Sequence, residues 1–117
     1  MREYLKFYID GQWIDPVEPK TADVINPATE EVAGRISVGS VADINKAVAA
    51  ARRAFSSWSQ TTPAERLELL LAIQAEYAKR QDELGVAIRE EMGAPAGLAG
   101  GFHVGLGAGH LQTAIEV

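Results

Sequence analysis

The sequence predicts an α+β protein in which N-terminal β-hairpins are followed by a layer of helices. Three observations lead to this prediction. Residues 1–39 carry short apolar runs separated by turn signals, residues 40–117 carry apolar residues at helical spacing, and strands and helices do not alternate. A complete nucleotide-binding sheet needs such alternation, so these 117 residues do not encode one. We therefore expect one partial segment, strand-rich over 1–39 and helical over 40–117.

Two strand pairs are expected in the strand-rich part. Asp10-Gly11 separates the apolar runs 6–9 and 12–14. This dipeptide favours a type I′ hairpin turn, because both central residues of that turn need a positive φ. The extended segments 23–27 and 32–38 form the second expected pair, since apolar residues alternate in the later segment as they do in a half-buried strand.

Capping residues mark the starts of two helices. Ser40 followed three residues later by Asp43 approximates a capping box, and the helix that it begins is expected to end at Trp58. Thr62, a following proline and Glu65 form the clearest helix start in the chain. The sequence therefore predicts two long helices in succession.

A third, shorter helix and a glycine-rich helical segment follow. Asp82 is expected to cap the third helix, which runs through Met92 and stops at Gly93 and Pro95. Residues 96–117 are rich in glycine and alanine, and their helical pattern runs to the last residue with no stop signal. Truncation inside an element is the simpler interpretation of that pattern. Because glycine destabilises a helix, we expect this segment to need partners for its order.

The apolar stripes of the helices predict one shared core. The aromatic residues Trp13, Trp58, Phe55 and Tyr77 are interpreted as anchors of that core. The core residues expected from helical spacing are Ile44, Val48, Phe55, Leu67, Leu70, Leu71, Tyr77, Leu84 and Ile88.

Composition excludes several classes of function. The net charge is -5 and basic residues are scattered, so the electrostatic footprint of a nucleic-acid-binding protein is missing. No apolar run approaches the ~20 residues of a membrane span, and no secretory signal is visible. The sequence has no cysteine, which excludes disulfides and thiolate nucleophiles and fits a cytoplasmic protein.

Three constellations of polar residues and glycines resemble parts of chemical sites. The glycines of 105–109 lack the spacing of G-x-G-x-x-G and follow no strand, so close helix packing is favoured over phosphate binding. His103 and His110 are separated by about 10.5 Å of helical rise, too far for one metal ion. Glu90-Glu91 are adjacent and point about 100° apart on a helix. From these residues the chain is expected to hold no catalytic and no cofactor-binding residue.

Five segments in the right order resemble the NAD(P)-dependent aldehyde dehydrogenases. The resemblance covers nearly the whole chain, and no single segment decides it. The segments are Phe7-Tyr8-Ile9-Asp10-Gly11-Gln12-Trp13, the stretch from Val24 to Glu31 around Asn26-Pro27, the helices on either side of Trp58, Glu90-Glu91-Met92-Gly93-Ala94-Pro95, and Gly109-His110-Leu111-Gln112-Thr113-Ala114.

The resemblance implies that the chain is the N-terminal lead-in to a Rossmann-like coenzyme domain. The family oxidises an aldehyde to a carboxylic acid with NAD or NADP, by way of a cysteine nucleophile and a glutamate base. Neither the cysteine nor the family's cofactor residues occur in this sequence. We therefore expect a fragment that is inactive alone, whose partners are the remainder of the parent polypeptide in a homo-oligomer, with no nucleic acid and no membrane. The alternative is a stand-alone helical binding or assembly module without catalysis.

One ligand site is implied by the family. Several members bind a monovalent cation through a backbone carbonyl before the Asn-Pro pair and an acidic side chain before the glycine of E-x-G-x-P. In this sequence those positions are Ile25 and Glu91. A further ligand of the family's site has no counterpart here, so a buried backbone group and a surface glutamate are an equally good interpretation.

Overall fold

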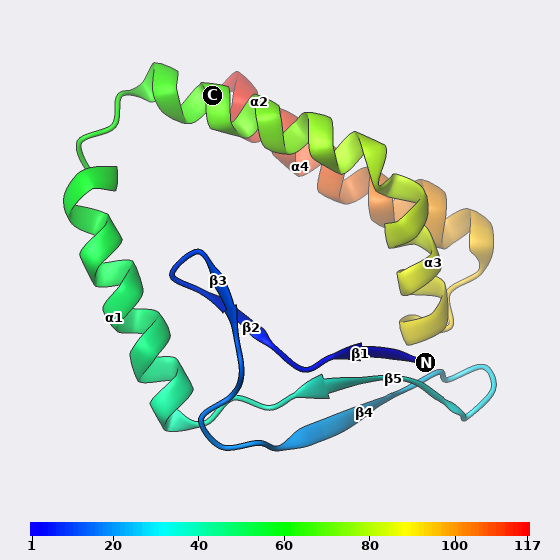
Figure 1. Ribbon diagram of the computed structural model, residues 1–117. Coiled ribbons are helices and arrows are strands. Elements are labelled where there is room, and N and C mark those ends of the chain that lie inside the picture. The colour runs from blue at the N-terminus through cyan, green and yellow to red at the C-terminus, as the bar shows by residue number, and fades with distance from the viewer. The chain divides into compact units, whose positions relative to one another are not determined.

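The computed structural model describes residues 1–117 as two compact units (Figure 1). The first unit comprises residues 1–25 and 30–60, and the second comprises residues 26–29 and 61–117. Strands occupy the chain between Arg2 and Ser37, and helices occupy it from Val41 onward.

A three-stranded sheet in the order β1-β5-β4 lies in the first unit. The antiparallel pair of β4 (Thr21–Ile25) and β5 (Val32–Ser37) confirms the second expected hairpin. β1 (Arg2–Tyr4) was not expected, and it pairs in parallel with β5. A Cβ at Gly34 would lie 3.0 Å from the Arg2 carbonyl oxygen, so glycine allows this close approach of the two strands.

The hairpin of β2 (Phe7–Ile9) and β3 (Gln12–Ile14) is the other strand pair of the first unit. Its turn has φ values of 57° at Asp10 and 74° at Gly11. Both values lie in the left-handed region that a type I′ turn requires, which confirms the prediction made from the Asp-Gly dipeptide.

Helix α1 (Val41–Trp58) begins at the expected capping box. One Asp43 oxygen accepts hydrogen bonds from the Ser40 N–H at 2.9 Å and the Ser40 hydroxyl at 2.8 Å. The other oxygen accepts the Val17 N–H at 2.9 Å, a contact that the sequence did not indicate. These bonds from Ser40 and Val17 lower the pKa of Asp43 below its ordinary value. Asp43 therefore fastens the loop before β4 to the start of α1.

Helices α2 (Pro63–Lys79) and α3 (Gln81–Met92) belong to the second unit. Thr62 and Glu65 form the reciprocal capping box that was expected. The prediction that Asp82 caps α3 is wrong, because α3 begins at Gln81 and Arg80 serves as the last cap of α2 and the first of α3. Because Arg80 is the only residue between the two helices, Asp82 lies inside the first turn of α3, where its negative charge interacts favourably with the helix dipole.

The glycine-rich segment is helical throughout. A π-helix, η1 (Leu98–His103), continues directly into α4 (Val104–Glu116). Helix α2 packs along α4, and α3 packs against η1 (Figure 1). A Cβ at Gly85 of α3 would lie 3.2 Å from the Gly100 Cα, so glycines let these two backbones approach closely.

The predicted core is largely wrong. Ile44, Val48 and Phe55 are 58%, 60% and 58% exposed, and Leu67 and Leu71 are exposed as well. Leu70, Tyr77, Leu84 and Ile88 are half-buried. The buried apolar residues are instead Ala50, Ala99 and Val104.

The error has a physical cause. Helical spacing shows that a face is apolar, but a face becomes a core only where a second layer covers it. The aromatic anchors fail for the same reason, because Trp13 is 65% and Trp58 46% exposed. None of the helices combines the length and the apolar character that crossing a membrane requires.

Candidate functional site

The glycines of 105–109 lie inside α4 and not in a loop. The start of α4 is not free either, since the Val104 N–H donates to the Ala99 carbonyl of the preceding π-helix. Phosphate-binding loops present unpaired backbone N–H groups at a helix start. The segment is therefore continuous helix and does not form a loop of that kind.

The glycine of α4 that matters most is covered by a tyrosine ring. Tyr77 of α2 donates its hydroxyl to the Val104 carbonyl oxygen at 2.8 Å. A Cβ at Gly107 would lie 3.1 Å from the Tyr77 Cζ atom and would press on the hydroxyl as well. Gly107 therefore makes room for the side chain that joins α2 to α4. The expectation of close packing at these glycines is met here, although the tyrosine was assigned only a general core role.

The two histidines lie in different surroundings. His103 is half-buried, and its ring lies edge-on to Phe102 with centroids 5.5 Å apart. His110 is exposed on α4. No three histidine, aspartate or glutamate side chains gather where they could hold a metal ion.

Two of the motif segments meet in the second unit. Gly93 ends α3 with φ at 67°, and a Cβ there would lie 2.8 Å from Pro27 Cγ and 3.7 Å from the Ala28 nitrogen. Asn26 holds the turn, because its side-chain oxygen accepts the Ala28 N–H at 2.9 Å. The glycine of the E-x-G-x-P segment thus both closes a helix and makes room for the Asn-Pro turn. Sequence reasoning identified only the first of these roles.

The two residues predicted to bind a cation belong to different units. Ile25 is the last residue of β4 and pairs with Val32 of β5. Glu91 lies in the last turn of α3, two residues before Gly93. Their joint role in binding a cation stays a proposal.

Comparisons of the sequence and of the fold with known proteins point to one and the same family. A sequence profile described as the aldehyde dehydrogenase family matches residues 13–117. The chain is 48% identical over 118 residues to a 3-succinoylsemialdehyde-pyridine dehydrogenase of a Pseudomonas species, a match that takes in 100% of this chain and 25% of that protein.

This chain belongs to the aldehyde dehydrogenase family. An aldehyde dehydrogenase of Bartonella henselae superimposes with a TM-score of 0.97 at 40% identity, over 99% of this chain and 24% of that one. A mutant of aldehyde dehydrogenase C from Pseudomonas syringae, crystallised with NAD+ and octanal, superimposes with a TM-score of 0.92 at 45% identity, over 95% of this chain and 23% of that one.

The chain spans about a quarter of the length of the aldehyde dehydrogenases that it matches, and it corresponds to their N-terminal quarter. It holds no cysteine, so it supplies no thiolate nucleophile. It supplies no phosphate-binding loop either, since its glycine-rich segment is helical. Within the chain, caps and glycines fix the paths of the helices.

Proposed function

We propose that the chain is the scaffold that leads into the coenzyme domain of an NAD(P)-dependent aldehyde dehydrogenase, and that it is inactive alone. The parent reaction is the oxidation of an aldehyde to a carboxylic acid. In this role the chain positions helices for the remainder of the dehydrogenase to pack on and contributes no group to the chemical step.

The observation that carries this proposal is the row of exposed apolar side chains on the two long helices. On α1, Val41, Ile44 and Val48 are all more than half exposed. On α2, Leu69 and Ile73, which lie one turn apart on the same face, are each 45% exposed. Exposed apolar side chains that share one face of a helix mark a surface that another layer covers. Since family relatives have about three quarters of their length beyond the matched part, the remainder of the dehydrogenase is the partner that we propose.

Two measurements on the purified chain test this role. Formation of NADH or NADPH from a panel of aldehydes is expected to stay at the level of the buffer, because no nucleophile is present. Titration with NAD+ is expected to leave the fluorescence of Trp13 and Trp58 unchanged. Turnover, or saturable binding of the nucleotide, would contradict the proposal.

The alternative, a helical binding or assembly module, is distinguished by its folding behaviour. An independent module unfolds in one cooperative transition as a defined monomer or oligomer. The scaffold that we propose exposes apolar faces and is expected to unfold over a broad range and to bind apolar dyes. Calorimetry together with sedimentation separates the two.

The finer features of the parent enzyme rest on the family alone. We propose that it uses NAD or NADP, assembles as a homo-oligomer and works in the cytoplasm. We also propose that the Ile25 carbonyl and Glu91 contribute to a monovalent cation site. If they do, K⁺ or Na⁺ is expected to raise the melting temperature of the chain more than an equal concentration of choline, and Glu91→Gln is expected to remove that difference.

A further inference from the structure

The turn of the β2–β3 hairpin places a carboxyl group beside an accessible backbone nitrogen. Asp10 and Gly11 lie beyond the last rung of the ladder, which joins Ile9 to Gln12. The Gly11 nitrogen is therefore not engaged in the pairing of the strands, and a Cβ at Gly11 would meet nothing within 4 Å. The Asp10 side chain is exposed as well. Both groups are thus open to each other and to water.

The residue after each aspartate decides how easily the two groups react. Only the carbonyl carbon, Cα and Cβ of Asp10 lie between its carboxyl carbon and the Gly11 nitrogen, so a change of rotation within the turn brings the two atoms together. Glycine has no side chain to shield its nitrogen. The other aspartates precede proline, valine, isoleucine and glutamate, and they are Asp15, Asp23, Asp43 and Asp82. Ring closure therefore meets least hindrance at Asp10.

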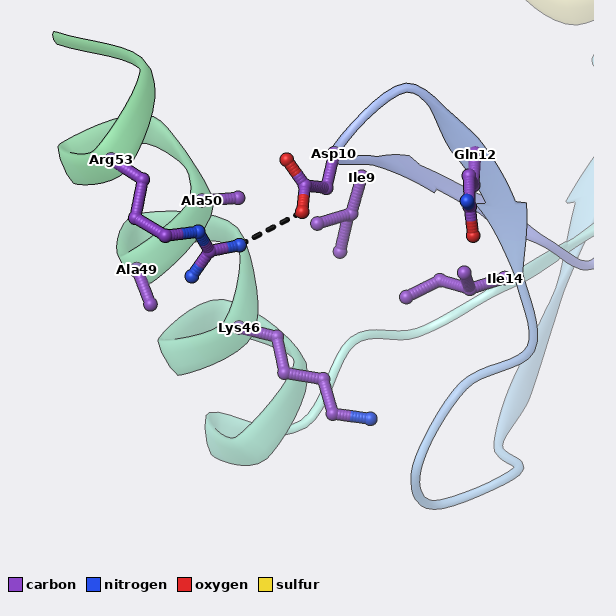
Figure 2. Close-up of a pocket in the computed structure, with 8 residues that line it drawn as sticks. All are labelled: Ile9, Asp10, Gln12, Ile14, Lys46, Ala49, Ala50 and Arg53. Carbon is purple, nitrogen blue, oxygen red and sulfur yellow. Dashed lines mark hydrogen bonds and ion pairs between the residues drawn. The ribbon is translucent and has the colours of Figure 1, made fainter.

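An arginine of α1 holds the Asp10 carboxylate (Figure 2). Arg53 Nη2 donates to Asp10 Oδ2 at 2.8 Å. A ring formed from Asp10 and the Gly11 nitrogen carries no carboxylate, so the ion pair is lost when Asp10 reacts. The pair therefore stabilises the starting state and slows the reaction, by the modest amount that an exposed ion pair contributes.

We propose that Asp10 is a site of spontaneous conversion to isoaspartate and that Arg53 protects it. The Gly11 nitrogen bonds to the Asp10 carboxyl carbon and loses its hydrogen, and one carboxylate oxygen leaves as water with that hydrogen and a proton from solvent. The product is a cyclic imide. Water then opens the imide at either carbonyl carbon and the proton returns to solvent, which gives aspartate or isoaspartate. One water molecule is released and one is taken up, so no oxidant or other reactant is needed.

Isoaspartate changes the backbone of the turn. The chain then runs through the Asp10 side chain, which adds a carbon atom to the backbone and leaves the free carboxylate on Cα. The type I′ turn, with φ values of 57° at Asp10 and 74° at Gly11, does not accommodate the longer backbone. The new carboxylate also leaves the position that Arg53 binds. Conversion is therefore expected to loosen the hairpin from α1.

This reaction does not depend on the proposed scaffold role. Asp10, Gly11 and Arg53 all belong to the first unit, and no step of aldehyde oxidation is assigned to them. A chain that fails to pack on any dehydrogenase would still be expected to form isoaspartate.

Incubation of the purified chain at neutral pH, followed by peptide mapping for isoaspartate, tests the proposal. Aspartyl and isoaspartyl peptides have equal masses and are separated by chromatography. Arg53→Gln removes the guanidinium that binds Asp10, whereas Arg52→Gln removes a neighbouring guanidinium that does not bind it. Both arginines are exposed, so neither substitution disturbs a packed side chain. Sodium chloride at high concentration screens the ion pair and serves as a second probe of its charge.

The expected result is isoaspartate at Asp10 and none at Asp23 or Asp82. Arg53→Gln should speed its formation by up to about fivefold, the range of one exposed ion pair, and Arg52→Gln should leave the rate unchanged. Salt should bring the rate of the parent chain toward that of Arg53→Gln. The proposal is overturned if Asp10 stays unmodified, if the other aspartates convert as fast, or if the two arginine variants behave alike.

Discussion

At the scale of single residues, two glycines of α4 differ in what surrounds them. A Cβ at Gly107 would meet the Tyr77 ring, whereas at Gly109 it would meet nothing within 4 Å. Gly107→Ala is therefore expected to displace the Tyr77 hydroxyl from the Val104 carbonyl and to destabilise the second unit by about 1–3 kcal/mol. Unfolding in urea, followed by circular dichroism, measures the change.

Gly109→Ala is the matched control. The same substitution in open space is expected to stabilise α4 by up to about 1 kcal/mol through helix propensity alone. If both variants shift the unfolding midpoint in the same direction, Tyr77 does not hold α4 in the way that the hydrogen bond indicates.

The buried carboxylate of Asp43 makes the stability of the first unit depend on pH. Its pKa is lowered in the folded chain, chiefly by the backbone hydrogen bonds from Ser40 and Val17. A lowered pKa contributes stability that is present above the unfolded value of about 3.9 and is lost as the pH falls through the folded pKa. Asp43→Asn is therefore expected to flatten the loss of helix signal in an acid titration.

Glu65 is the control for this acid titration. Its pKa is lowered too, by the hydrogen bonds from Thr62, so Glu65→Gln should flatten the acid response of α2 instead. Residue-resolved NMR separates the two helices. An unchanged acid response of α1 in the Asp43→Asn variant would contradict the account of its cap.

At the scale of elements, the capping box of α2 should contribute measurably to the stability of that helix. Thr62 accepts the Glu65 N–H at 3.2 Å and its own N–H donates to Glu65 at 2.7 Å. Thr62→Ala removes the side-chain acceptor and is expected to destabilise the helix by about 1 kcal/mol in urea unfolding. Gln60→Ala, just before the cap, serves as the control and should change little.

Elements fixed by local chemistry could be predicted from the sequence. The capping boxes at Ser40 and Thr62, the Asp10-Gly11 turn and the left-handed Gly93 each depend on a few neighbouring residues. Elements that depend on distant partners could not be predicted. β1 is recognisable only through its pairing with β5, and η1 only through its packing against α3.

The candidate sites follow the same division. The sequence predicts close helix packing at the glycines of 105–109, because the strand and spacing of a phosphate-binding loop are missing, and Gly107 packs in this way against Tyr77. It could not reveal that Pro27 would contact Gly93, since 65 residues separate them in the chain. The ion pair of Asp10 with Arg53 was missed as well, because it exists only where the hairpin meets α1.

At the scale of the whole molecule, the sequence correctly identifies the apolar stripes of the helices, but the prediction that these stripes are buried is wrong. Ile44, Val48 and Phe55 recur at helical spacing, yet all three are exposed. The helical spacing of apolar residues shows that one face of a helix is apolar. Only a covering layer decides whether that face is buried. The family relation supplies that layer in the proposal, as the part of an aldehyde dehydrogenase that this chain does not match.

Hydrogen exchange of α1 and α2 tests this central claim most directly. The amides of the chain would be compared alone and after mixing with the unmatched three quarters of the Pseudomonas relative. We expect weak protection alone and at least about tenfold slower exchange in the mixture, because covering an apolar helix face raises its local opening free energy. Full protection in the isolated chain, with no change on mixing, would contradict the account.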